Sequence, residues 1–202
     1  ANSVQAMIDA VPEGAILCLD EAYIEFAPEL TAPPIDVSNP RVIRFRTFSK
    51  AYGMAGARVG YGIAEAGLAL AFNKVRNHFG VNSIAQAGAL AALRDRKYFQ
   101  ECLEKVIEQR NVIASQFDDF GWHQIPSSAN FIFVQPKCSE NGVGPKVALS
   151  LFKHLSEDNI LVRYFPKHPQ TSSFLRISIG KPCEMSILMD SIKTWRQKKQ
   201  QG

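Results

Sequence analysis

The sequence lacks any long uninterrupted run of apolar residues. A membrane-spanning helix needs about 18 or more such residues in a row, and the 202-residue chain has no run of this kind. The first residues also lack the basic segment and apolar stretch of a secretory signal. These two absences predict a cytoplasmic protein without membrane association.

Cysteine and histidine are few, and neither shows the paired spacing of metal ligands. The chain has four of each, at the scattered positions Cys18, Cys102, Cys138, Cys183, His78, His123, His154 and His168. We therefore expect no metal site and no disulfide. Cys18 falls inside an apolar run, so we expect a small buried side chain there rather than a reactive thiol.

The chain also lacks a strong excess of one charge. Its formal net charge is +4, and the only basic cluster spans residues 193–199. Such a cluster is typical of a solvated helix end, so nucleic-acid binding is not expected. Hydrophobic residues make up 46% of the chain, which is enough to build a sizeable core.

What the sequence does contain is a regular succession of short apolar runs and helical patterns, which predicts an α/β fold. The expected helices span 3–11, 65–77, 83–94, 97–120, 145–156 and a segment starting at Pro182, and the expected strands span 15–19, 42–48, 57–64, 130–134, 160–164 and 174–179. The helix over 65–77 is expected to bury Leu68, Phe72 and Val75. Ser83 and Gln86 have the spacing of a capping box, with Ser83 as the N-cap.

The pattern of elements changes after Gly121. A long helix over 97–120 precedes this glycine, and a mixed strand and helix unit follows it. We therefore expect two domains, the first over residues 1–120 with the long connecting helix at its end, and the second over residues 121–202.

One motif with chemical potential lies at residues 46–61, RTFSKAYGMAGARVGY. A β-branched and aromatic strand ends here in hydroxyl groups and a lysine, and an arginine follows. Thr47, Ser49 and Arg58 can bind a phosphate, and Lys50 can form a Schiff base. Taken alone, the pattern also fits a strand followed by an ordinary glycine-rich turn.

A second motif, LCLDEAYIEF at residues 17–26, ends another apolar strand in a carboxylate and a phenol, Asp20 and Tyr23. Ligands of α/β sheets gather at the carboxyl ends of the strands. The two motifs are therefore expected to meet at one site.

Together the two motifs resemble the fold-type I pyridoxal-phosphate (PLP) aminotransferases, and most closely the histidinol-phosphate aminotransferase family. The resemblance implies part of a three-layer α/β/α large domain followed by a small α/β domain. It begins just before the strand that carries Asp20. We therefore expect the C-terminal portion of such an enzyme, lacking the N-terminal half and binding the cofactor weakly by itself.

The resemblance assigns roles to residues of both motifs. Lys50 would be the catalytic lysine that binds PLP covalently and later acts as general base. Asp20 would be a buried carboxylate that keeps the pyridinium nitrogen protonated, and Tyr23 would contact the ring 3-oxygen. Ser49 and Arg58 match phosphate-binding positions, and Thr47 belongs to the same motif with a less defined role.

Three further residues match substrate-pocket positions of the family. Arg176 lies in a strand whose neighbours Leu175 and Ile177 point to the core, so its side chain belongs to the opposite face. That pattern also fits an ordinary edge-strand arginine in water. In the family this position grips the anionic end of the substrate; Arg163 matches a second pocket arginine, and Asn130 belongs to a nearby motif without an assigned role.

The resemblance therefore predicts a PLP-dependent transaminase of histidine biosynthesis that acts on histidinol phosphate with 2-oxoglutarate and glutamate. Family members pair, so a homodimer is expected. Two other activities use the same cofactor residues, aromatic amino-acid transamination and threonine-phosphate decarboxylation. A folded remnant without activity that dimerises is the alternative of another class.

Overall fold

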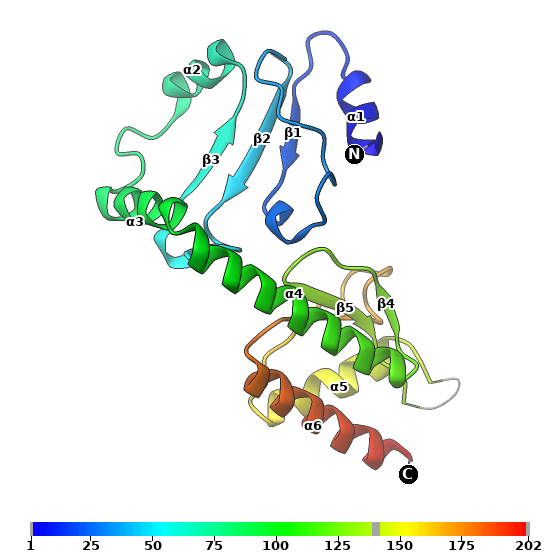
Figure 1. Ribbon diagram of the computed structural model, residues 1–202. Helices are drawn as coiled ribbons and strands as arrows, with labels where there is room; N and C mark the ends of the chain where they lie inside the picture. Colours follow the sequence, from blue (N-terminus) through cyan, green and yellow to red (C-terminus); the bar gives the residue numbers. More distant parts are fainter. Residues whose placement is uncertain (1, 139–141, 201–202) are drawn as a thin grey trace. The chain divides into compact units, whose positions relative to one another are not determined.

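The computed structural model describes residues 2–138 and 142–200 (Figure 1). The chain divides into two compact units, Ala1–Leu103 and Glu104–Gly202. The division falls inside one long helix, α4 (Arg96–Asp119). The division into domains over residues 1–120 and 121–202, expected from the sequence, stays a prediction.

The first unit has a three-stranded sheet in the order β1-β2-β3. Its strands are β1 (Leu17–Asp20), β2 (Val42–Thr47) and β3 (Gly60–Ile63). β1 and β2 are parallel, with Asp20 paired to Phe45, whereas β3 runs antiparallel to β2. The carboxyl ends of β1 and β2 therefore lie at the same edge of the sheet, as expected from the sequence.

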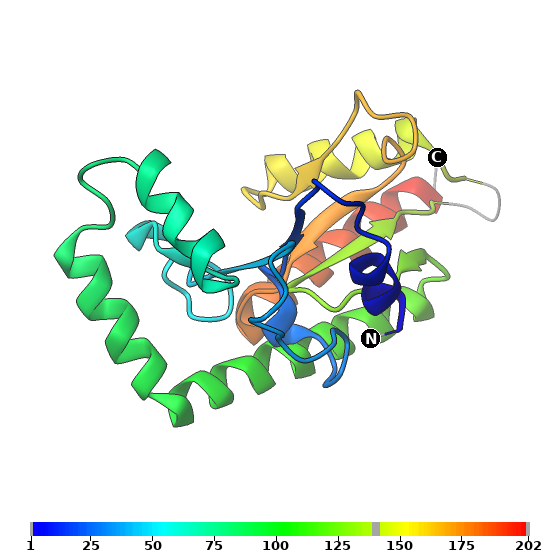
Figure 2. The same cartoon turned by 90° about the horizontal axis from the view of Figure 1, so that it is seen from above.

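Three helices accompany this sheet. They are α1 (Asn2–Asp9), α2 (Ala66–Val75) and α3 (Ser83–Arg94). Figure 1 shows α1 on the β1 side and α2 on the β3 side, and the view from above in Figure 2 agrees. Two short 3-10 turns, η1 (Ile24–Phe26) and η2 (Ala55–Ala57), lie within the motifs that carry Asp20 and Lys50.

The capping box predicted at Ser83 is wrong by one residue. Asn82 is the N-cap of α3, and its side-chain oxygen accepts a hydrogen bond from the backbone N–H of Ala85 at 2.8 Å. Gln86 instead donates to the backbone oxygen of Val81 at 2.6 Å. Asparagine is as good an N-cap as serine, so Asn82 satisfies one of the free N–H groups of the first turn.

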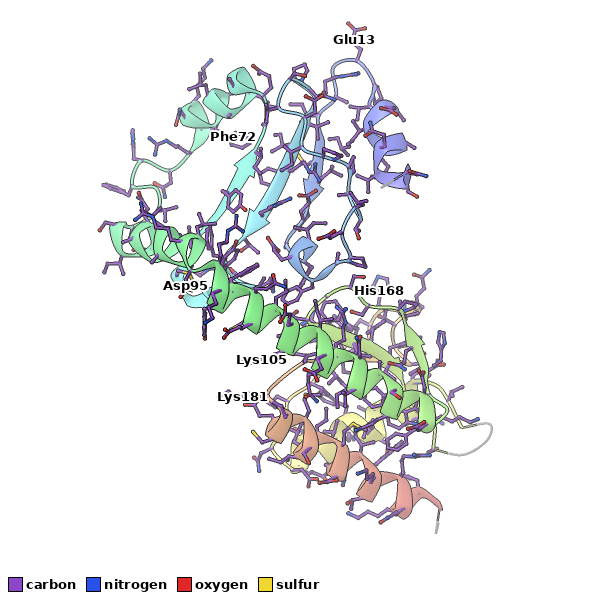
Figure 3. The ribbon with its side chains drawn as sticks, in the orientation of Figure 1. Glu13, Phe72, Asp95, Lys105, His168 and Lys181 are labelled. Carbon is purple, nitrogen blue, oxygen red and sulfur yellow. The ribbon has the colours of Figure 1, made fainter. Side chains whose placement is uncertain are left out.

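The burial predicted for α2 is also wrong. Phe72 packs edge-on against Phe45 with 6.4 Å between ring centroids, yet it is 41% exposed, and Val75 is 78% exposed (Figure 3). Leu68 is half-buried. A sheet of three strands is too narrow to cover the apolar face of this helix, so α2 buries no residue completely.

Cys18 is exposed rather than buried, which corrects a further expectation. β1 is an edge strand, and its residues alternate between half-buried and exposed. The run over residues 15–19 reads as a strand covered on both faces, but only one face of β1 is covered in the described part of the chain. The missing cover leaves the Cys18 thiol accessible.

The second unit has a four-stranded antiparallel sheet in the order β4-β5-β7-β6. Its strands are β4 (His123–Ile125), β5 (Phe131–Gln135), β6 (Arg163–Tyr164) and β7 (Leu175–Ser178). The sequence patterns did not predict β4, and β6 is shorter than the expected strand over 160–164.

The core of this unit lies between one face of the sheet and the helices α4, α5 (Pro145–Glu157) and α6 (Pro182–Gln200). On the sheet, Ile132 pairs with Ile177 and Val134 with Leu175, and all four are buried. Each helix adds fully buried side chains to the same cluster, among them Phe117, Leu155 and Ile192. The opposite face of the sheet carries Arg163 and Arg176 together with the aromatic side chains of Phe131 and Phe133.

Candidate active site

The parallel pairing of β1 and β2 positions the first group of candidate residues. Asp20 is the last residue of β1, Thr47 is the last residue of β2, and Lys50 follows shortly after. Gly60 of β3 pairs with Thr47, and a Cβ at this glycine would lie 2.8 Å from the backbone oxygen of Arg46. Only glycine therefore lets β3 approach β2 this closely at the site.

Lys50 sits in a tight turn. The backbone N–H of Gly53 donates to the oxygen of Lys50 at 3.0 Å, and Met54 N–H donates to the oxygen of Phe48 at 2.9 Å. Gly53 has φ +67°, a conformation that favours glycine. Phe48 is buried beneath the turn and packs against Tyr52 with 4.8 Å between centroids. These contacts fix the backbone that presents the lysine.

Lys50 and Tyr23 lie together although they come from different motifs. The Lys50 Nζ atom is 5.2 Å from the centroid of the Tyr23 ring, within the range of a cation–π contact. Asp20 Oδ1 accepts a hydrogen bond from the Ala22 N–H at 3.0 Å, which orients the carboxylate. Asp20 is exposed, so the expectation of a buried carboxylate is wrong for this chain.

Arg58 closes the other side of the turn. It follows η2 with φ 52°, the left-handed region that non-glycine residues seldom adopt. Its Nη1 donates to the backbone oxygen of Ala55 at 2.8 Å and lies 3.4 Å from Ser49 Oγ. Thr47 Oγ1 accepts from the Ser49 N–H at 3.0 Å. Two hydroxyl groups and one guanidinium are thus collected in one place.

These side chains line a single pocket of about 420 Å³, which holds five of the six predicted cofactor residues: Asp20, Thr47, Ser49, Lys50 and Arg58. Small-molecule pockets typically measure about 300–1,000 Å³. Tyr23 is joined to the group through its contact with Lys50. The structure therefore brings the two sequence motifs together, and their roles toward a ligand remain proposals.

The sequence reasoning missed a buried ion network beside this pocket. Glu21, next to Asp20, is 8% exposed and accepts hydrogen bonds from Arg44 Nε at 2.6 Å and Arg46 Nε at 3.1 Å. Arg44 also donates to the backbone oxygen of Pro33 at 2.7 Å. The alternation of Arg44 and Arg46 along β2 was the available signal, because it puts both cations on one face.

The network affects neighbouring titratable groups. Burial works to lower the pKa of Arg46, but the hydrogen bond and charge of Glu21 and the nearby Tyr61 raise it overall. Burial raises the pKa of the Glu25 carboxyl, against the opposing effects of its backbone hydrogen bond and of Arg46. Glu25 Oε2 is buried without a hydrogen-bond partner in the described part of the chain.

The second unit carries the other predicted residues, and two of them, Arg163 and Arg176, lie on the sheet face opposite its core. Arg163 and Arg176 are direct partners in the β6–β7 ladder, and Arg176 Nε is buried without a hydrogen-bond acceptor among the described residues. Asn130 precedes β5, and its backbone oxygen accepts from the Ile179 N–H at 2.9 Å. The arrangement offers two adjacent guanidinium groups to an anion.

Residues 2–138 and 142–200 contain no group of three or more His, Cys, Asp or Glu side chains placed to hold a metal ion. Nor does any helix in these ranges have the length and apolar character needed to cross a membrane.

Comparison with known proteins gives the family. Residues 1–192 match the family model described as aminotransferase class I and II. The chain belongs to this family. The α/β architecture and the resemblance drawn from the two motifs are confirmed.

Similar proteins carry one recurrent description. A histidinol-phosphate aminotransferase of Geobacter sp. (strain M21) is 39% identical over 178 residues, which cover 88% of this chain and 48% of the relative. The enzyme of the same description from Syntrophotalea carbinolica is 40% identical over 172 residues, covering 84% and 46%. The chain therefore spans about half the length of the curated relatives it matches.

Solved structures agree on the fold. The histidinol-phosphate aminotransferase of Sinorhizobium meliloti, solved with pyridoxal 5'-phosphate, superposes with a TM-score of 0.89 at 39% identity, covering 98% of this chain and 53% of that one. An L-threonine-O-3-phosphate decarboxylase from Porphyromonas gingivalis shares the fold at 20% identity and a TM-score of 0.71. The chain thus has part of the fold-type I aminotransferase fold.

Proposed function

We propose that this chain is the C-terminal portion of a PLP-dependent aminotransferase that transfers the amino group of histidinol phosphate to 2-oxoglutarate. One observation carries the proposal. A lysine, a carboxylate, two hydroxyl groups and an arginine from two strand ends line the same pocket of about 420 Å³. The descriptions of the relatives support the choice of substrate.

The residues of the pocket fit PLP chemically. Lys50 is a primary amine for the aldehyde, Asp20 is an anion for the pyridinium nitrogen, and Tyr23 is a phenol beside the lysine. For the phosphate there are donors on Ser49 and Arg58, and Arg58 is already held toward Ser49. When bound, PLP supplies the electron sink that makes the substrate Cα–H acidic.

The remaining catalytic work falls to residues of this chain. Lys50, anchored by the turn that ends at Gly53, holds the cofactor and then moves the proton from the substrate Cα. The Tyr23 ring, 5.2 Å from Lys50 Nζ, keeps the amine on the pocket side of the turn. Asp20 binds and orients the ring nitrogen, and its hydrogen bond from Ala22 fixes the carboxylate for this task.

Arg176 and Arg163 bind the anionic end of the substrate in this proposal. Histidinol phosphate carries a phosphate and no carboxylate, whereas 2-oxoglutarate and its product glutamate in the second half-reaction carry carboxylates. Arginine forms paired hydrogen bonds with either group. Arg176 Nε is buried without an acceptor in the part of the chain that the structure describes, which supports a ligand oxygen near this side chain. Asn130, at the start of β5, is proposed as a further pocket residue without a defined role.

A homodimer is part of the proposal. Several large apolar side chains of the first unit are exposed, including Phe79 at 94% and Ile84 at 84%. Exposed apolar patches promote association. Sedimentation that gives a monomer across the accessible concentration range would contradict the dimer, including a dimer formed by a remnant without activity.

The substrate assignment can be tested by assay. This chain, extended by the N-terminal half of the Geobacter relative, should transfer the amino group of histidinol phosphate to 2-oxoglutarate. Phenylalanine and threonine phosphate serve as competing substrates in matched assays. Faster turnover of either compound would replace the proposed substrate with an aromatic amino acid or a decarboxylation reaction.

A further inference from the structure

Two like charges face each other on the second unit's sheet. Arg163 of β6 and Arg176 of β7 are Cα partners in the antiparallel ladder, so both side chains belong to the same face. Like charges directly opposite one another destabilise a sheet. An arrangement that holds both guanidinium groups here needs a compensating contact within the protein.

Phe165 provides that contact to both arginines. The guanidinium carbon of Arg163 lies 5.4 Å from the Phe165 ring centroid, and that of Arg176 lies 6.0 Å from it. Arg176 also lies 5.2 Å from the Phe131 ring centroid. These distances are within the range in which the electron-rich ring face attracts a cation. One phenylalanine ring therefore interacts with two opposed cations.

The Phe165 ring is itself held by other rings. It packs edge-on against Phe133 with 6.2 Å between centroids and an interplanar angle of 73°. Phe133 is the ladder partner of Arg176 on β5, and it stacks on Phe174 at 4.8 Å and 15°. The contact with Phe133 fixes the position of Phe165 over the sheet, whereas Phe174 packs on Phe133. The contact to the two arginines is thus built into the packing.

We propose that Phe165 is a positioning residue for the anionic end of the substrate. The inference rests on the proposed function, which assigns that end to Arg163 and Arg176. Ordering a long side chain on binding costs affinity, and a binding site whose arginines are already ordered avoids that cost. Phe165 acts through both arginines, and Arg176 Nε has no hydrogen-bond acceptor among the described residues.

The test uses inorganic phosphate and the complete 202-residue chain, without cofactor. NMR resonances of the Nε–Hε groups of Arg163 and Arg176 report phosphate binding directly. Phe165→Leu should weaken phosphate binding at least about fivefold, because two arginines lose their order. Phe165→Tyr keeps a ring and should bind as wild type does.

Phe174→Leu is the matched control, because it makes the same change in the same stack of rings. Among the described residues, Arg163 and Arg176 have cation–π contacts with Phe131 and Phe165 and not with Phe174. The phosphate affinity of the Phe174→Leu variant should stay close to that of wild type. Equal losses in the two leucine variants would overturn the proposal, since a general disturbance of the stack would explain both.

A wild-type measurement decides the matter if Phe165→Leu does not fold. Ring faces shield protons above them, so the Hε protons of Arg163 and Arg176 should resonate upfield of that of Arg76, an exposed arginine. Coincident shifts would contradict the inference, as would a wild-type chain whose arginines do not respond to phosphate. Phosphate binding with a Lys50 that does not react with PLP would instead contradict only the proposed function.

Discussion

Glu21 and Arg44 form a buried ion pair that ties β1 to β2 next to the candidate active site. Arg44 Nε donates to Glu21 Oε1 at 2.6 Å, and the two residues are 4% and 8% exposed. Glu21 directly follows Asp20, and Arg44 precedes Thr47 on the neighbouring strand. The pair therefore sets the relative position of the two strand ends that deliver the pocket residues.

Removing one partner of this pair should be strongly destabilising. Glu21→Gln leaves the Arg44 charge buried without its carboxylate, and such losses cost about 3–5 kcal/mol of unfolding free energy. Urea denaturation, followed through spectroscopic signals of residues in the first unit, measures the change in unfolding free energy. Asp190→Asn removes the exposed pair with Lys193 and should change stability little. A similar small effect for both variants would show that the buried pair contributes no more to stability than the exposed pair does.

The partly buried carboxyl of Glu25 should make the stability of the chain depend on pH. Burial raises the pKa of its carboxyl above the ordinary value of 4.5. The folded state therefore binds the proton more tightly than the unfolded state, and the chain loses stability as pH rises through the folded pKa. Glu25→Gln has no ionised form, so its thermal midpoint should exceed that of wild type at about pH 8, with the difference closing at about pH 4.

The control for this pH effect is Glu29→Gln, which changes an exposed glutamate. Its difference from wild type should not follow the same pH course. Circular dichroism melts over the pH range give the midpoints. A Glu25→Gln variant that is less stable than wild type above neutral pH would indicate that the carboxylate is stabilised there, contrary to the burial argument.

The position of the α3 N-cap can be checked by two adjacent substitutions. Asn82→Ala removes the side-chain oxygen that accepts the Ala85 N–H and should cost about 1 kcal/mol. Ser83→Ala changes the first helical residue and should cost less. Hydrogen exchange of the amides in the first turn of α3 reports both. A larger effect at Ser83 would restore the capping box read from the sequence.

The sequence predicted the elements of the fold better than their burial. The spacing of apolar residues located the long helix over 97–120 and the alternation of Leu175, Arg176 and Ile177, since both depend on local periodicity. Burial depends on what packs against an element. Cys18, Phe72 and Val75 therefore differ from expectation, because their covering layer is not determined by their own segments.

The candidate site, too, could be predicted only where it depends on local sequence patterns. Residue types and strand ends predicted that Asp20 and Lys50 meet, because parallel strands end at one edge of the sheet. The contribution of Glu21 and the position of Phe165 between two arginines depend on distant pairings. Such pairings follow from the register of strands far apart in the sequence, which no single motif reveals.

Lys50 is the proposed amine of the PLP pocket, and covalent trapping tests this role most directly. The 202-residue chain is treated with PLP, any Schiff base is reduced with borohydride, and the modified lysine is located by peptide mass. Modification should be concentrated at Lys50, absent in Lys50→Ala and retained in Lys74→Ala, which changes an exposed lysine of α2. Modification spread evenly over the lysines, or unchanged in Lys50→Ala, would contradict this role of Lys50.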